Sequence, residues 1–141
     1  MSILRDDAQV ALHDLYIALR ESIDLYQFAG EYLHGAAAKT CASIAADRTE
    51  LAARVAEAIR ATGDLPAEPD RDRETAEKLR EQLDALFADD REEGIIEHRR
   101  RAERELLALL DGETLSELGG GYADLLAQCR TSVTVALEQL G

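Results

Sequence analysis

The chain has 141 residues and carries 16 Lys and Arg against 29 Asp and Glu, which gives a formal net charge of −13. This balance argues against binding to nucleic acid or to an anionic membrane surface, because both need clustered cationic side chains. With no basic-then-apolar leader and no apolar stretch of about 18 residues, we expect one soluble, cytoplasmic, all-α domain over residues 1–141.

The first predicted helix covers residues 2–34, with Ser2 as its N-cap. Apolar residues recur along it at alternating steps of three and four, which is the spacing of a buried helical face. This face consists of Leu12, Tyr16, Leu19, Ile23, Tyr26, Gly30 and Leu33. Because Ile17, Leu25 and Phe28 lie off this face, we expect them either to pack against a later helix or to form a dimer surface.

The second predicted helix covers residues 37–62 and ends at Gly63, because the following Pro66 prevents continuation. Its apolar face contains one cation. This face consists of Cys41, Ile44, Arg48, Leu51, Val55 and Ile59. A charge on the buried side of a bundle is costly unless it is paired, so Arg48 needs a partner.

A third helix, over residues 70–88, is highly charged and has only a narrow apolar face. Asp89 and Asp90 interrupt it, and each has a Glu three residues later, which is the spacing of a capping box. We therefore predict a new helix over residues 91–110, whose buried face again contains charges. This face consists of Ile96, Arg99, Glu103, Leu106 and Leu110.

The last predicted helix opens at Thr114, which has Glu117 at capping-box spacing. Gly119–Gly121 weakens its first turns, since each glycine costs roughly 1 kcal/mol relative to Ala. Beyond these glycines the apolar face is regular and consists of Leu126, Cys129, Val133, Ala136 and Leu140. Cys41 and Cys129 both fall on predicted core faces, and we interpret them as buried free thiols.

Four broad-faced helices and one connecting helix fit two arrangements. If residues 70–88 cross over between two hairpins, the bundle is ferritin-like, and the helices over 37–62 and 91–110 run in the same direction. Counted from the two helix starts, Arg48 then lies within about 3 Å of rise of Glu103, and we predict a buried ion pair between them. If residues 70–88 and 91–110 instead form one rod, this match is accidental.

Residues 46–51, followed by residues 61–66, resemble the second helix of a bacterial ferritin-like family of unknown function, within the rubrerythrin and ferritin-like superfamily. Residues 95–103 resemble a later helix of that family, and residues 26–29 resemble its first. The resemblance implies a ferritin-like four-helix bundle with an additional connecting helix. Members of that family often carry a His in the last helix, whereas this chain has Leu137 near the corresponding position.

A di-iron carboxylate site needs inward-facing acids on all four helices, two of them in Glu-x-x-His pairs. The predicted core faces offer only Glu103. Glu21 and Glu50 are expected at the same height in the bundle as Glu103, and these three residues are the candidate metal ligands, with iron as the candidate cofactor. Glu50, however, belongs to a solvated face with i,i+4 charge pairs. Glu31-x-x-His34 has the right spacing but lies at a helix end, where we expect His34 to interact with the helix dipole.

For the remaining histidines and cations we expect contacts at the protein surface. We expect His13 to lie at the surface. His98 precedes the cationic run Arg99–Arg101, which we expect to form salt bridges with the acidic third helix; a contact with an anion or a partner is the functional alternative. Because no Ser or Cys has a convincing His partner and no strand is predicted to precede a glycine-rich loop, we assign no catalytic residue.

These observations favour a non-catalytic helical-bundle module that acts by binding a protein partner or by forming a homo-oligomer, and that lacks a complete di-iron site. The alternative is a metal-binding or di-iron oxidoreductase, or an iron-handling protein of the ferritin-like type. The two differ in the number of acids that face the core, and the sequence count favours the first.

Overall fold

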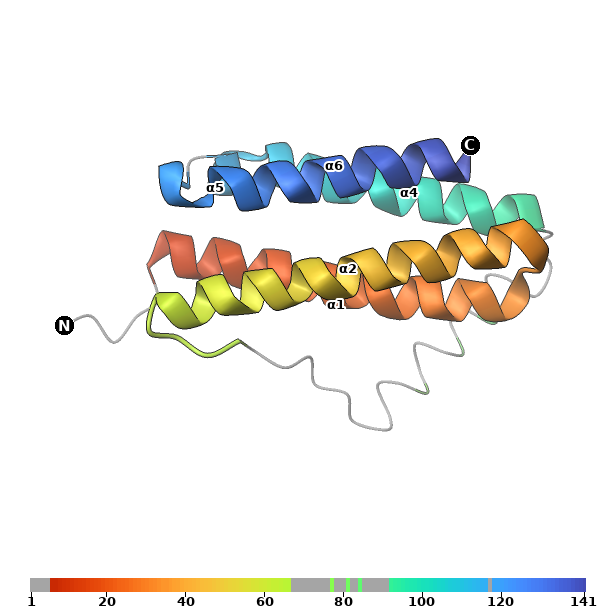
Figure 1. Cartoon of the computed structure of the whole chain (residues 1–141), viewed down its shortest axis with the longest axis horizontal. Helices are drawn as coiled ribbons and strands as arrows, with labels where there is room; N and C mark the ends of the chain where they lie inside the picture. Colours follow the sequence, from red (N-terminus) through yellow and green to blue (C-terminus); the bar gives the residue numbers. More distant parts are fainter. Residues whose placement is uncertain (1–5, 67–76, 78–80, 82–83, 85–91, 117) are drawn as a thin grey trace.

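The computed structural model describes residues 6–66, 77, 81, 84, 92–116 and 118–141. The described residues form an all-α bundle (Figure 1) that consists of α1 (Asp7–Tyr32), α2 (Gly35–Ala61), α4 (Glu92–Asp111), α5 (Glu113–Ser116), the 3-10 turn η1 (Gly120–Tyr122) and α6 (Ala123–Leu140). In the helix predicted over residues 70–88, the described residues Glu77, Glu81 and Asp84 are helical and exposed; its other residues, with Asp89 and Asp90, lie outside the described part. No helix in the described ranges is long and apolar enough to cross a membrane.

The four long helices form two antiparallel pairs, α1 with α2 and α4 with α6 (Figure 1). The colours of Figure 1 show that α2 and α4 run in the same direction, as do α1 and α6. Because α2 packs beside α1 and α6, and α4 packs beside the same two helices, α2 and α4 lie diagonally across the bundle. A simple up-down order of four helices would make α2 and α4 antiparallel, and the described helices do not follow that order.

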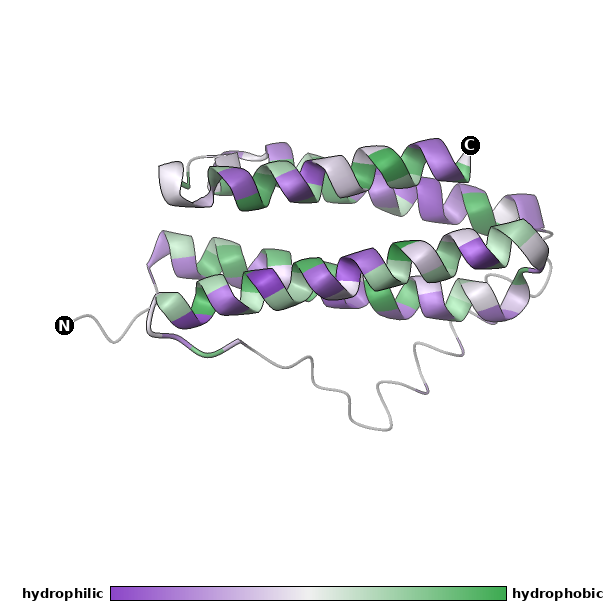
Figure 2. Ribbon diagram, viewed as in Figure 1, coloured by the Kyte–Doolittle hydropathy of each residue, from purple (hydrophilic) through white to green (hydrophobic). Residues whose placement is uncertain are grey.

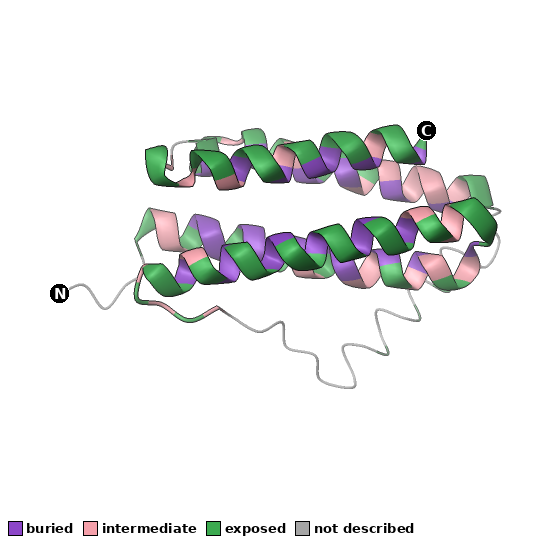
Figure 3. Cartoon of the chain, in the orientation of Figure 1, coloured by how far each residue is buried: buried purple, intermediate pink, exposed green. Residues whose placement is uncertain are grey.

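Apolar residues line the inner faces of the helices, and the buried positions coincide with them (Figures 2 and 3). The buried apolar residues form two clusters. One includes Leu12, Val55 and Leu110, and the other includes Tyr26 and Ile95. Between the clusters lie buried polar side chains from all four long helices, here called the polar layer: Ser22, Arg48, Arg99, Glu103 and Ser132.

Helix boundaries differ from the sequence prediction by more than two residues at two places. Helix α1 begins at Asp7, because Asp6 has extended backbone and forms a reciprocal capping box with Gln9; Ser2 lies outside the described residues. The single helix predicted from Thr114 onwards is wrong. The chain instead makes the one-turn α5, then an extended Gly119 (φ −61°, ψ 178°) and η1 before α6 begins, because three successive glycines do not sustain a helix there.

His13 is buried, which corrects the surface prediction. Its two ring nitrogens each lie 2.9 Å from a backbone carbonyl oxygen, Nδ1 from Gln9 and Nε2 from Leu65. The side chain therefore ties the segment after α2 to the first turns of α1. Of the second apolar stripe of α1, Leu25 and Phe28 are half-buried against the core and Ile17 is 37% exposed. The later helix or second copy expected to cover this stripe stays a prediction.

The capping box of α1 generates a stability prediction. Asp6→Ala removes the acceptor for the Gln9 backbone N–H, so we expect a loss of about 0.5–2 kcal/mol in the free energy of unfolding. The matched control is Asp7→Ala, which removes a first-turn charge without a capping hydrogen bond. Urea denaturation in 1 M NaCl, where the helix-dipole effect is screened, should separate the two variants; equal midpoints would contradict the capping role.

Candidate functional site

Arg48 lies at the centre of the bundle and bonds to one side chain on each of the other three long helices. Nη1 donates to Ser22 Oγ of α1 at 2.8 Å, and Nε donates to Ser132 Oγ of α6 at 2.8 Å. Both Nη atoms donate to the Glu103 carboxylate of α4, with Nη1 at 3.0 Å from Oε2 and Nη2 closer still to Oε1. Arg48 is completely buried and Glu103 is 1% exposed, so this is a bidentate ion pair shielded from water.

The sequence places these groups together because each occupies a core position of its own helix. Arg48 lies one turn from Ile44 and Leu51 on the buried face of α2, and Ser132 lies beside Val133 on that of α6. Small hydroxyl side chains leave room for the guanidinium and accept hydrogen bonds from its N–H groups. A larger apolar residue would leave these N–H groups without acceptors.

Arg99 of the polar layer contacts Tyr26, which belongs to the second apolar cluster. The Arg99 guanidinium lies 5.0 Å from the centroid of the Tyr26 ring, and that of Arg48 lies 5.9 Å away, so one ring contacts two cations. Burial lowers the pKa of Arg99, and the interactions with Tyr26 and Glu103 oppose this shift. Burial, followed by the negative charge of Glu103, raises the pKa of Tyr26 far above its usual value and keeps its hydroxyl neutral.

The sequence gives two expectations for Arg99, a place on the buried face of its helix four residues before Glu103 and a surface salt bridge within the run Arg99–Arg101. The structure agrees with the first, because Arg99 is 1% exposed. Ser22 and Ser132 were missed. Their signal was weaker, because a serine on a core face is common and becomes informative only once a buried guanidinium is known to need acceptors.

The structure does not bring the three candidate metal ligands together. Glu21 and Glu50 are exposed on α1 and α2, whereas Glu103 is buried and paired with Arg48. Among the described residues, no group of three or more His, Cys, Asp or Glu is arranged to hold a metal ion. His34 is exposed at the start of α2.

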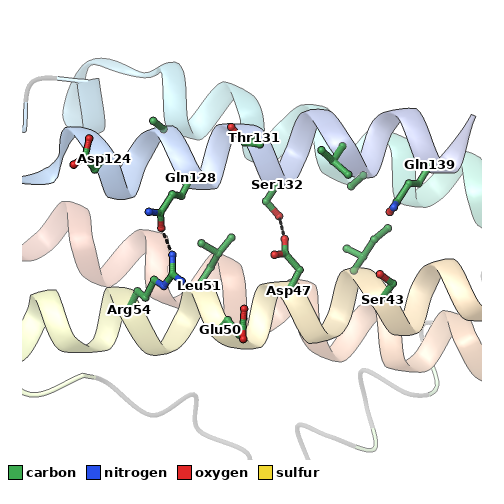
Figure 4. A pocket seen from close by; sticks show the side chains of 14 residues that line it. Ser43, Asp47, Glu50, Leu51, Arg54, Asp124, Gln128, Thr131, Ser132 and Gln139 are labelled. Carbon is green, nitrogen blue, oxygen red and sulfur yellow. Dashed lines mark hydrogen bonds between the residues drawn. The ribbon is translucent and has the colours of Figure 1, made fainter.

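A groove of about 640 Å³ runs between α2 and α6 (Figure 4). It is here called the α2/α6 groove and is lined by Ser43, Ile44, Asp47, Glu50, Leu51, Arg54, Asp124, Ala127, Gln128, Thr131, Ser132, Val135, Ala136 and Gln139. Two side-chain hydrogen bonds cross it: Ser132 donates to Asp47, and Arg54 donates to Gln128. Ser132 also accepts from Arg48, so the groove floor is connected directly to the polar layer.

No protein-family model, curated protein or solved structure matches this chain. The resemblance to a ferritin-like family therefore stays a prediction from the residues quoted for it.

The buried ion pair generates the largest stability prediction. Glu103→Gln leaves the Arg48 guanidinium buried without a counter-charge, and we expect it to lower the free energy of unfolding by about 3–5 kcal/mol. Glu105→Gln, on the exposed face of the same helix, should change it by no more than about 0.5 kcal/mol. Urea denaturation measures both, and similar midpoints for the two variants would contradict the importance of the pair.

The two free cysteines generate a prediction of reactivity. Burial raises the pKa of Cys129 to about 11 and raises that of Cys41, so neither thiol forms much of the reactive thiolate at pH 8. We expect no rapid reaction of either with Ellman's reagent in the folded protein and two equivalents released in guanidinium chloride. Rapid release of a full equivalent from the folded protein at pH 8 would contradict this environment.

Proposed function

We propose that this chain is a non-catalytic helical-bundle module of ferritin-like character that binds a helical segment of a protein partner along the α2/α6 groove. The ferritin-like character is supported by the parallel course of α2 and α4, which are separated in sequence by the long connection over residues 62–91. Such a crossing order is typical of ferritin-like bundles.

The polar layer supports a role without a di-iron centre. Among the buried residues that the structure describes, this layer contains two guanidinium groups, Arg48 and Arg99, and one carboxylate, Glu103. A di-iron bundle needs carboxylates from all four helices at this depth. Here the position is filled by a cation that already occupies both oxygens of the carboxylate, and its charge would repel a metal ion.

The α2/α6 groove is the observation that carries the proposal. It lies between the antiparallel helices α2 and α6. Ile44, Leu51 and Ala136 are the buried apolar residues of its lining, and polar side chains line it as well. Laying the apolar face of an amphipathic helix into such a groove is a recurring mode of protein recognition. Val135, which is 42% exposed, adds apolar surface on the α6 side.

The test uses three synthetic helices of equal length with the same leucine stripe and with Lys, Gln or Glu on the polar face. Fluorescence anisotropy with the full chain should detect binding of at least one of them. Ala127→Trp, which fills the groove, should weaken that binding at least tenfold, which is about 1.4 kcal/mol.

The matched control is Ala108→Trp, which adds the same side chain to an exposed position of α4 outside the groove. It should leave binding unchanged, and circular dichroism should show the same helix content and melting temperature for both variants. Binding of none of the three helices, or equal weakening by both Trp variants, would overturn the proposal.

A further inference from the structure

We propose that the segment bound in the α2/α6 groove is an amphipathic helix whose polar face carries Lys or Arg; this inference rests on the proposed function and specifies the chemistry of its partner. The observation behind it is the distribution of charge around the groove. Three carboxylates line it, those of Asp47, Glu50 and Asp124, against the single guanidinium of Arg54.

The one cation in the groove already has a partner on the opposite wall. The Arg54 guanidinium donates to the side-chain oxygen of Gln128 across the groove (Figure 4). By contrast, the Asp47 carboxylate accepts a hydrogen bond from the neutral Ser132 hydroxyl, which leaves its negative charge uncompensated by that contact. The groove therefore offers more negative than positive charge to a ligand.

The acids are placed where the polar face of a docked helix would lie. Glu50 and Asp47 project from α2, and Asp124 projects from α6, with Leu51 between the two helices (Figure 4). All three acids are exposed, whereas Leu51 is 4% exposed. A leucine stripe on the ligand can thus face the floor while its lysines or arginines reach acids on both sides, an arrangement that gives specificity and faster association.

Electrostatics also favours a cationic partner over a second copy of this chain. Docking two such grooves against each other would bring like charges together, which is destabilising near a protein surface. In the described part of the chain, the exposed cations Arg101 and Arg104 of α4 do not form a matching cationic face, because Arg104 pairs with Glu97 and Glu105 lies beside it. We therefore assign the groove to a different, cationic chain.

The experiment compares two double variants that remove the same charges. Glu50→Gln with Asp124→Asn neutralises the groove rims, and Asp14→Asn with Glu138→Gln neutralises exposed acids outside the groove. We expect the Lys helix to bind the unmodified chain more tightly than the Gln and Glu helices. The groove variant should weaken the Lys helix roughly five- to tenfold and leave the Gln helix unchanged, while the control variant should change neither.

The outcomes separate this inference from the proposed function. Equal binding of the Lys and Gln helices, both lost in Ala127→Trp, would overturn the cationic partner but leave groove docking standing. Equal weakening of the Lys helix by the two double variants would show general attraction to an acidic protein and would overturn the inference. A dimer in sedimentation at micromolar concentration that Ala127→Trp dissociates would identify a second copy as the occupant and would also overturn it.

Discussion

The arrangement of the four long helices depends on how the protein supplies hydrogen-bond acceptors and a counter-charge to one buried cation, Arg48. A guanidinium presents five N–H donors and keeps its charge at any pH the protein meets. Once Arg48 is completely buried, those donors and that charge must be satisfied by the protein, and the acceptors come from α1, α4 and α6. No shift of one helix by a turn would keep all of these bonds, so the heights of the four helices are fixed together at this layer.

A buried ion pair contributes less to stability than its Coulomb attraction indicates, because both charges lose their hydration. The two apolar clusters on either side of the layer supply most of the burial, and α1 packs on α2 along its length within them. Leucine-rich faces of this kind tolerate alternative registers, however. The polar layer disfavours such registers, since any displacement leaves a buried charge without its partner.

Much of this arrangement could be predicted from the sequence, because it follows from periodicity. The faces of α1, α2, α4 and α6 come directly from apolar spacing, and the charges on two of them made Arg48 and Glu103 conspicuous. Periodicity does not determine which polar side chains near a buried face are themselves buried. His13 was misplaced for this reason, since it is buried where its ring contacts the backbone of Leu65.

The α2/α6 groove could not be predicted at all, because it arises from the packing of two helices far apart in sequence. Its position is nevertheless a consequence of the polar layer. Ser132 accepts from Arg48 on its inner side and donates to Asp47 on its outer side, so a single hydroxyl joins the bundle centre to the groove. A small residue there satisfies the guanidinium but fills little volume, which leaves α6 and α2 with a hollow between them. The residue that completes the core thus also shapes the surface at which a partner is proposed to bind.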